Sequence, residues 1–255
     1  MKVVVKVGTS TLAHTTGRLN IRRTSELCRV LSDLKNAGHE VILVSSGAIG
    51  MGVGKLGLRE KPTDIPTKQA AAAVGQCELM YTYDRLFTEY NHTVAQILLT
   101  GADFLAEDRH KNFNNTMSRL LSLGVLPIIN ENDTIATEEI KVGDNDTLSA
   151  LVAVSVEAEL LIILSDVDGL YDADPHKNNG AKLIERVHGI PESIFALAGE
   201  PGSSLGTGGM KTKLNAAKIC IEKGVDMVIA NGENPSLLYD IVTGQESGYT
   251  RFYAK

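Results

Sequence analysis

Short apolar runs alternate with longer amphipathic segments along the whole chain. The short runs are rich in β-branched residues and leucine, as buried parallel strands are, and the longer segments repeat apolar residues every three or four positions, which is typical of helices packed on a core. This alternation predicts an α/β fold, a three-layer α-β-α sandwich with a central, mainly parallel sheet. Strands are predicted at 3–7, 40–44, 94–99, 125–129, 160–164 and 225–230, and helices at 20–37, 67–90, 109–123, 145–156, 210–223 and 236–242. Weaker patterns predict a hairpin at 134–142, a strand at 182–187, a helix at 191–198 and an edge strand at 249–253.

Small and polar residues follow the predicted strands directly. Lys6 lies near the end of the first strand, before Gly8 and three hydroxyl residues, and the second strand runs into a Ser-Ser-Gly turn at 45–47. Glycine lets the backbone turn tightly, and successive N–H groups in such a turn can hold an anion. Because open α/β sheets bind ligands at the carboxyl ends of their strands, we expect a binding site at this edge.

Two clusters of acidic and amide residues also lie where a predicted strand ends or a predicted helix begins. Residues 130–133, Asn-Glu-Asn-Asp, follow the fourth strand, and residues 144–146, Asp-Asn-Asp, open a helix. A solvated Asx turn is the alternative for the first cluster, and a helix cap explains one residue of the second but not all three. Both clusters are therefore candidates for binding a polar ligand.

A glycine-rich segment at 199–209 leads into a helix with Lys211 and Lys213 in its first turn. A flexible loop before a helix N-terminus that carries lysines favours an anion site, with a plain linker as the alternative. The other glycine pattern, G-x-G-x-x-G at 52–57, does not follow a strand directly and lacks an acidic residue about 20 positions later, so an NAD-binding oxidoreductase is disfavoured.

The composition limits the binding partners and the cellular compartment that we expect for this chain. With 255 residues the chain can form one large domain or two lobes, and its net charge of −6 argues against nucleic acid or an acidic membrane as the main partner. No apolar run approaches the ~20 residues of a membrane span, and no signal peptide is visible. Three distant cysteines without metal spacing indicate reduced, mostly packed thiols and a cytoplasmic protein.

The candidate residues offer positive charge without an obvious general base. The chain has no Ser-His-Asp order and no metal-binding cluster of histidine and cysteine. Such chemistry suits phosphoryl transfer, where catalysis is mostly alignment and neutralisation of charge on the transferred group. It suits best an acceptor that is already ionised, such as a carboxylate with a pKa near ~4.3, because that group needs no base at neutral pH.

Six motifs give the chain a specific resemblance. They lie at 4–10, 45–50, 128–133, 142–150, 164–171 and 206–213, with the sequences VVKVGTS, SSGAIG, IINEND, VGDNDTLSA, LSDVDGLY and GTGGMKTK. In this order they resemble the amino acid kinase family over essentially the whole chain, and the two acid–amide motifs resemble those of its glutamate-phosphorylating members. The resemblance implies the amino acid kinase fold and ATP-dependent phosphorylation of the γ-carboxylate of L-glutamate to L-glutamyl 5-phosphate, the first step of proline biosynthesis, with Mg²⁺ as cofactor.

The same resemblance implies roles for individual residues. Lys6 and Lys213 would hold the phosphoryl group in transit, and Asp146 would orient the two lysines. The residues that would bind glutamate are Ser46, Asp133 and Asn145. The residues that would bind ATP are Lys6, Ser165, Asp166, Thr207, Gly208, Gly209, Met210, Lys211, Thr212 and Lys213. No residue is assigned to the metal.

The family pattern also divides the chain into two lobes. The first, about 1–156, would bind the acceptor and the second, about 157–255, would bind ATP. A homo-oligomer (dimer or tetramer) and feedback inhibition by L-proline are implied. Many such kinases continue into a C-terminal PUA-type domain, which is not expected within these 255 residues.

Two alternatives to a glutamate-phosphorylating enzyme stay open. One is another acyl-phosphate-forming kinase of the same fold, acting on acetylglutamate, aspartate or carbamate. The other is a non-catalytic sensor of nucleotides or amino acids, against which the presence of Lys6, Lys213 and Asp146 argues.

Overall fold

A single mixed sheet runs through the computed structural model, which describes residues 1–14, 18–60, 62–135, 144–173, 178, 180–196, 209–245 and 248–254. The sheet has eight strands in the order β3-β4-β2-β1-β5-β7-β8-β6. Neighbouring strands run parallel except β7 and β8, which confirms the predicted mainly parallel sheet. The strands are β1 (Lys2–Val7), β2 (Glu40–Ser45), β3 (Val94–Leu99), β4 (Leu126–Glu131), β5 (Leu160–Ser165), β6 (Arg186–His188), β7 (Asp226–Asn231) and β8 (Thr250–Tyr253).

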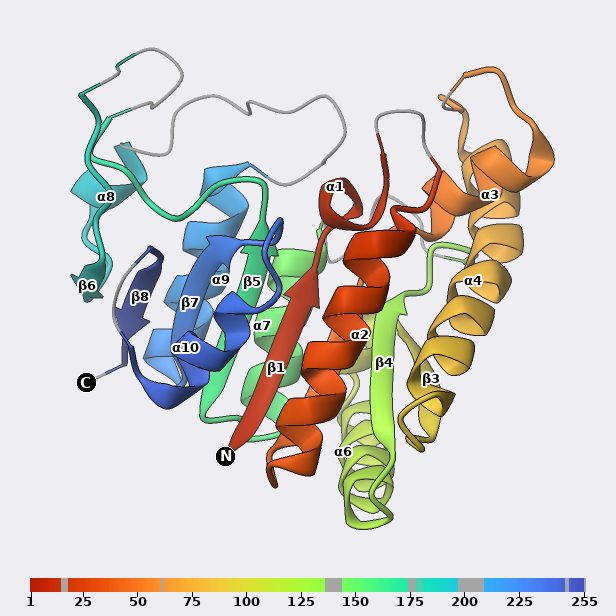
Figure 1. Cartoon of the computed structure of the whole chain (residues 1–255), viewed down its shortest axis with the longest axis horizontal. Coiled ribbons are helices and arrows are strands. Elements are labelled where there is room, and N and C mark those ends of the chain that lie inside the picture. The colour runs from red at the N-terminus through yellow and green to blue at the C-terminus, as the bar shows by residue number, and fades with distance from the viewer. Residues whose placement is uncertain are drawn as a thin grey trace.

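Helices cover both faces of the sheet, as the apolar pattern predicts (Figure 1). One face packs against α2 (Ile21–Asn36), α4 (Ile65–Thr88) and α10 (Leu237–Thr243). The opposite face packs against α6 (Glu107–Ser122), α7 (Asn145–Ser155) and α9 (Met210–Glu222). Each interface is a continuous apolar cluster, so the three-layer α-β-α sandwich is confirmed. The shorter helices are α1 (Thr9–Leu12), α3 (Ala48–Leu56), α5 (Gly101–Leu105) and α8 (Glu192–Ala196).

The two-residue repeat of the strands decides which face each polar side chain joins. On β1, Val4 packs in the α7–α9 cluster, so Lys6, two positions later, lies on that same face. On β4, Ile128 packs in the α2–α4 cluster, so Asn130 lies on the face covered by α4. At the same edge of the sheet, Lys6 therefore lies on one face and Asn130 on the opposite face.

Helices α3 and α4 cross with their backbones in direct contact. A Cβ atom placed on Gly75 would lie 1.7 Å from the carbonyl oxygen of Ala48, and one placed on Gly52 would lie 1.8 Å from that of Ala71. No side chain fits into either gap, so both positions require glycine. The first glycine of the G-x-G-x-x-G pattern therefore serves helix packing.

Some predicted boundaries were wrong. The helix predicted from 67 begins at Ile65, because Pro66 fits the first turn and the side chain of Asp64 accepts a hydrogen bond from the backbone N–H of Thr67 (2.9 Å). Helix α6 begins at Glu107 rather than at 109, and the strand predicted at 182–187 is replaced by β6. The one-turn helices α1 and α5 were missed, since so short a segment has no helical period. Most of the predicted hairpin at 134–142 lies outside the described residues.

Within the described part of the chain, no helix combines the length and the apolar character that a membrane crossing requires.

Candidate active site

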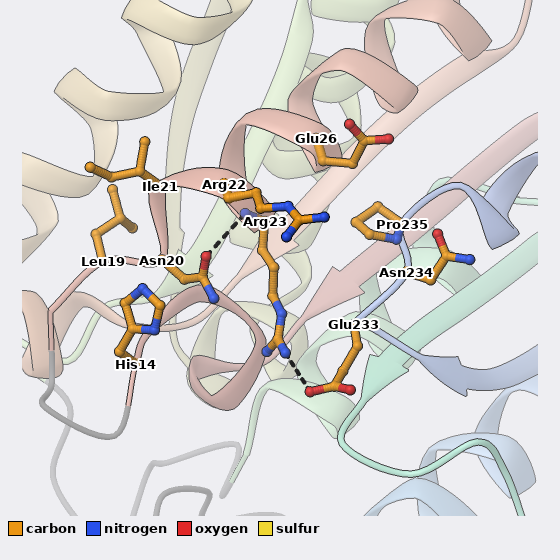
Figure 2. A pocket seen from close by; sticks show the side chains of 10 residues that line it. All are labelled: His14, Leu19, Asn20, Ile21, Arg22, Arg23, Glu26, Glu233, Asn234 and Pro235. Carbon is orange, nitrogen blue, oxygen red and sulfur yellow. Dashed lines mark hydrogen bonds and ion pairs between the residues drawn. The ribbon is translucent and has the colours of Figure 1, made fainter.

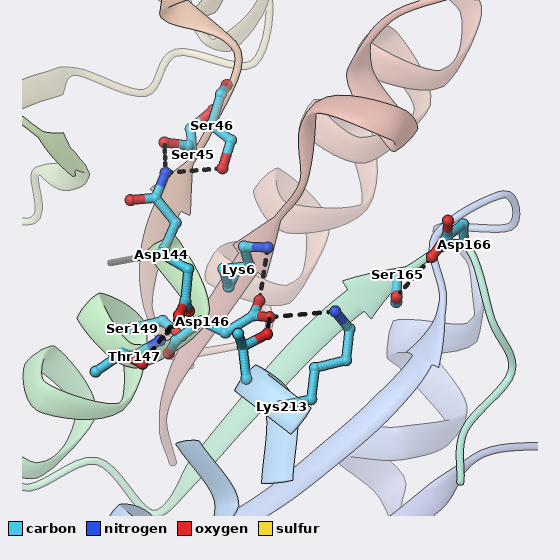
Figure 3. A network of polar contacts seen from close by, with 12 residues as sticks. Lys6, Ser45, Ser46, Asp144, Asp146, Thr147, Ser149, Ser165, Asp166 and Lys213 are labelled. Atoms are coloured by element: carbon cyan, nitrogen blue, oxygen red, sulfur yellow. Dashed lines mark hydrogen bonds and ion pairs between the residues drawn. The ribbon is translucent and has the colours of Figure 1, made fainter. Parts of the chain in front are cut away.

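Three charged side chains from distant parts of the chain meet at the carboxyl edge of the sheet (Figure 3). The Nζ atom of Lys6, on β1, lies 2.7 Å from Oδ1 of Asp146, in the first turn of α7. The Nζ atom of Lys213, in the first turn of α9, lies 3.1 Å from Oδ2 of the same carboxylate. The exposed fractions of Lys6, Asp146 and Lys213 are 8%, 1% and 5%, so each ion is stabilised by its neighbour more than by water. These three residues are called the charged cluster below.

The carboxylate of Asp146 stays ionised in this cluster. Burial alone would raise the pKa of Asp146, but the charges of Lys6 and Lys213 outweigh that effect and hold the pKa well below its ordinary value. The hydroxyl of Thr212 donates to Oδ2 of Asp146 (2.8 Å), and this hydrogen bond also lowers the pKa of Asp146. When ionised, two lysines and one aspartate carry a net positive charge, which favours an anionic ligand beside them.

The first turns of α7 and α9 supply Asp146 and Lys213, and β1 supplies Lys6, so both helix N-termini lie at the carboxyl edge of the sheet. Asp144 caps α7 by accepting a hydrogen bond from the backbone N–H of Thr147 (2.8 Å), which leaves Asn145 and Asp146 to face the site. Burial raises the pKa of Asp144, and the nearby charge of Asp146 acts in the same direction. Among the lysines of α9, Lys211 is exposed to solvent, whereas Lys213 turns into the cluster.

A network of uncharged polar groups occupies the same edge on the α4 side. The side-chain amide of Asn145 donates to Oγ of Ser46 (2.7 Å), to Oδ1 of Asn130 (3.0 Å) and to the carbonyl of Ser45 (3.2 Å). Asn130, in turn, donates to Oε1 of Gln76 on α4 (2.9 Å). These five residues are called the amide network below.

One atom of the amide network is left without a partner. Oδ1 of Asn145 is buried and has no hydrogen-bond partner within the described part of the protein. An unpaired buried oxygen costs free energy, so this atom is suited to accept a hydrogen bond from a ligand.

The other predicted site residues lie nearby with different degrees of burial. Asp133 is half-buried in the turn that follows β4. At the end of β5, the buried Ser165 donates from Oγ to Oδ1 of the exposed Asp166 (3.1 Å), beyond Lys213 in Figure 3. Gly209 caps α9 and Met210 is its first residue. The predicted positions Thr207 and Gly208 lie outside the described residues.

Sequence reasoning missed two contributions to this site. It assigned Thr212 to ATP, whereas its hydroxyl also reaches Asp146, and it did not single out Gln76. The available signal for Gln76 was its position between Ala72 and Leu79 on the buried face of a predicted helix. A polar residue on such a face needs a partner.

A separate cavity of about 650 Å³ lies between the start of α2 and the loop after β7 (Figure 2). Both of its acidic residues form ion pairs: Glu233 with Arg23, and Glu26 with Arg29 (2.6 Å). None of the predicted site residues that the structure describes lines this cavity. Its contacts connect α2 with the loop between β7 and α10.

An α/β sheet that gathers buried lysines and helix N-termini at its carboxyl edge is typical of enzymes that handle phosphorylated ligands. The model of the amino acid kinase family matches residues 1–231, and the chain belongs to that family.

Similar proteins extend this family assignment. The chain is 54% identical over 259 residues to a protein of Clostridium perfringens named glutamate 5-kinase, covering 100% of this chain and 96% of the relative. It is 54% identical over 250 residues to a glutamate 5-kinase of Caldanaerobacter subterraneus, covering 98% of this chain and 67% of that one. It is 55% identical over 246 residues to a glutamate 5-kinase of Clostridium tetani, covering 96% and 92%.

Solved structures share the fold at low sequence identity. A carbamate kinase from Giardia lamblia bound to AMP-PNP matches with a TM-score of 0.69 and 17% identity, over 99% of this chain and 98% of that chain. A UMP kinase from Ureaplasma parvum matches with a TM-score of 0.67 and 15% identity, with the same coverage.

Proposed function

We propose that the chain is a kinase that transfers the γ-phosphoryl group of ATP to the γ-carboxylate of L-glutamate, giving L-glutamyl 5-phosphate and ADP, the first step of proline biosynthesis. The observation that carries the proposal is the charged cluster of Lys6, Asp146 and Lys213 beside the amide network. Relatives named glutamate 5-kinase, at about 54% identity over nearly the whole chain, support glutamate as the acceptor.

The charged cluster can reduce the repulsion between the two anionic groups that must react. The acceptor carboxylate and the γ-phosphate are both anions, so they repel each other until cations lie between and around them. As the new bond to phosphorus forms and the bond to the β–γ bridging oxygen breaks, charge spreads over the equatorial oxygens. Lys6 and Lys213 are positioned to neutralise that charge, and Asp146 holds both ammonium groups in place.

No general base is required for this acceptor. A carboxylate with an ordinary pKa near ~4.3 is ionised at neutral pH, so the attacking oxygen has no proton to lose. The role of Asp146 is therefore to orient charge rather than to accept a proton, which agrees with a pKa held well below its usual value.

The amide network and Asp133, in the turn after β4, supply complementary groups for an amino acid. Oδ1 of Asn145 and the carboxylate of Asp133 can accept hydrogen bonds from the α-ammonium of glutamate, and the hydroxyl of Ser46 can donate to a carboxylate. In this proposal the lobe at about 1–156 binds the acceptor.

ATP would bind to the second lobe, at about 157–255. Ser165, Asp166 and the start of α9 would line its site, and Thr207 and Gly208 remain predictions from the sequence. The described residues hold no cluster of three or more His, Cys, Asp or Glu side chains suited to a metal. Mg²⁺ in phosphoryl-transfer sites is held largely by substrate phosphates, and we propose that it enters with ATP. Proline feedback, a homo-oligomer and a cytoplasmic location stay predictions.

Hydroxylamine trapping tests the proposed function. L-Glutamate, ATP, Mg²⁺ and hydroxylamine should give a glutamyl hydroxamate and a matching amount of ADP, because hydroxylamine captures the acyl phosphate. Aspartate, acetylglutamate and carbamate serve as competing acceptors. Turnover with one of them and none with glutamate would contradict the proposal.

A further inference from the structure

One hydrogen bond of the amide network involves a residue of α4 that belongs to neither the predicted glutamate site nor the predicted ATP site, and it helps to set the orientation of the amides. Gln76 is 7% exposed, and its Oε1 atom accepts a hydrogen bond from Nδ2 of Asn130 (2.9 Å), which is 2% exposed. Gln76 presents the acceptor end of its amide, so this bond favours the orientation in which the NH₂ end of Asn130 points toward α4.

The orientation is passed on to Asn145. With Nδ2 of Asn130 held by Gln76, Oδ1 of Asn130 faces Asn145 and accepts from its Nδ2 atom (3.0 Å). The backbone N–H of Glu131 donates to the same oxygen (2.9 Å) and favours the same orientation. Asn145 therefore turns its Nδ2 end toward Asn130, Ser46 and the carbonyl of Ser45, which leaves its Oδ1 atom without a partner among the described residues.

Without an acceptor at position 76, Asn130 loses one of the two contacts that fix its orientation, and only the backbone N–H of Glu131 still favours it. A reversed Asn130 would present its NH₂ group to the NH₂ group of Asn145, and two donors repel. Asn145 would then either move away from Asn130 or reverse and lose its hydrogen bond to the carbonyl of Ser45 (3.2 Å), and either change displaces the oxygen that the ammonium group of the acceptor needs. The close crossing of α3 and α4 at Gly75, the residue before Gln76, holds α4 at the depth this contact requires.

We infer that Gln76 is a positioning residue for the acceptor amino acid: it acts through Asn130 to present Oδ1 of Asn145 to the α-ammonium group. The inference rests on the proposed function, because it takes glutamate as the acceptor. Gln76 itself need not touch the substrate.

The test compares kcat and KM in Gln76→Met, Gln76→Ala and Gln76→Glu with the unmodified protein. Methionine keeps the length of the side chain and alanine suits a helix, but neither offers an acceptor to Asn130. Both should raise KM for glutamate roughly five- to tenfold, the effect of one hydrogen bond, with KM for ATP and kcat within about threefold. Glutamate at position 76 keeps an acceptor oxygen and should restore KM to within about threefold.

The matched control is Thr82→Val on the same helix. Thr82 is 6% exposed and its hydroxyl donates to the carbonyl of Glu78 in α4 (2.9 Å), so this variant removes a buried hydrogen bond outside the network. Its KM for glutamate should be unchanged.

Each outcome decides a different point. An unchanged KM for glutamate in Gln76→Met and Gln76→Ala overturns the inference and leaves the proposed function standing. Loss of folding in both, with Gln76→Glu folded, also overturns it, because the bond would then hold the fold rather than the site. An unmodified protein without glutamate-dependent turnover overturns the proposed function first.

Discussion

The two faces of the sheet carry different kinds of polar structure at the same edge. On the face covered by α7 and α9, two lysines share one buried carboxylate, and the contacts are ionic. On the face covered by α4, amides and hydroxyls form hydrogen bonds with defined donors and acceptors, and no charge takes part. The first arrangement responds to charge and the second to the shape and orientation of a ligand.

The two regions meet at two consecutive residues. Asn145 belongs to the amide network and Asp146 to the charged cluster, and both lie in the first turn of α7. In the proposed reaction, a single helix start would therefore set the position of the phosphoryl group relative to the acceptor. The difference between the regions leads to different expected effects when each is altered.

The largest effect is expected from the charged cluster. Lys6→Ala or Lys213→Ala should lower kcat by roughly 10²–10³, about 3–4 kcal/mol, with a smaller effect on substrate binding, because the lysines act most strongly on charge that develops in transit. Arginine should rescue poorly at either position, since a planar fork does not replace a compact ammonium group. Steady-state kinetics with both substrates varied measures this.

The matched control for the lysines is Lys211→Ala, two residues from Lys213 on the same helix and exposed to solvent. It should turn over within about twofold of the unmodified protein. An inactive Lys211→Ala together with a normal Lys213→Ala would assign the chemistry to the other lysine.

Changes to the residues proposed to bind glutamate should act on a different constant, KM. Asn145→Ala or Asp133→Ala should raise KM for glutamate roughly 10- to 150-fold, corresponding to about 1.5–3 kcal/mol for a charge-assisted contact, and leave KM for ATP nearly unchanged. Initial rates at saturating ATP give the first constant and initial rates at saturating glutamate give the second. An equal rise in both would argue that these residues do not distinguish the two substrates.

The crossing of α3 and α4 supports the amide network and should be sensitive to one methyl group. Gly75→Ala places a Cβ atom 1.7 Å from a backbone oxygen, so the helices must separate, at a cost of about 1–3 kcal/mol in unfolding free energy. The control is Gly50→Ala on α3, where the nearest atom would be 3.7 Å away and alanine should be neutral or slightly stabilising. Equal denaturant midpoints for the two variants would show that the crossing tolerates the added atom.

The smallest effect concerns the pH dependence of stability. The pKa of Asp146 is held well below its ordinary value, near ~3.9, by Lys6 and Lys213. In acid the unfolded carboxyl therefore binds a proton that the folded one does not, and the contribution of Asp146, complete at neutral pH, declines as pH falls below about 4. The decline is at most about 1.4 kcal/mol per pH unit.

Asp146→Asn removes this titration, so its unfolding free energy should fall less steeply between pH 4 and pH 3 than that of the unmodified protein. Denaturant unfolding at each pH measures both slopes. Parallel slopes would mean that the carboxyl is not held in an ion pair.

The local rules of strands and helices account for much of the fold and part of the site. Period two alone places Lys6 with Val4 and Asn130 with Ile128, so the sorting of polar groups onto two faces could be predicted from the apolar pattern. The cap at Asp144 follows from local chemistry as well. The pairing of Lys6 and Lys213 with Asp146 required the family resemblance, because no local pattern joins residues so far apart.

The contact of Gln76 with Asn130 could not be predicted in the same way. It depends on how deeply α4 packs, which two glycine contacts with α3 decide, and helix periodicity carries no information about that depth. The short helices α1 and α5 were missed for a related reason, since one turn is too short to show a period. What the sequence leaves undetermined is therefore packing between elements rather than the elements themselves.

The central claim is that the charged cluster and the amide network control different kinetic quantities. It is tested most directly by measuring kcat and KM for glutamate in Lys213→Ala, Asn145→Ala and the double variant at saturating ATP. We predict that the loss in kcat follows the lysine, that the rise in KM follows the asparagine, and that kcat/KM of the double variant falls by the product of the two single effects. A double variant no worse than Lys213→Ala alone, or a Lys213→Ala that raises KM as much as Asn145→Ala does, would contradict the account.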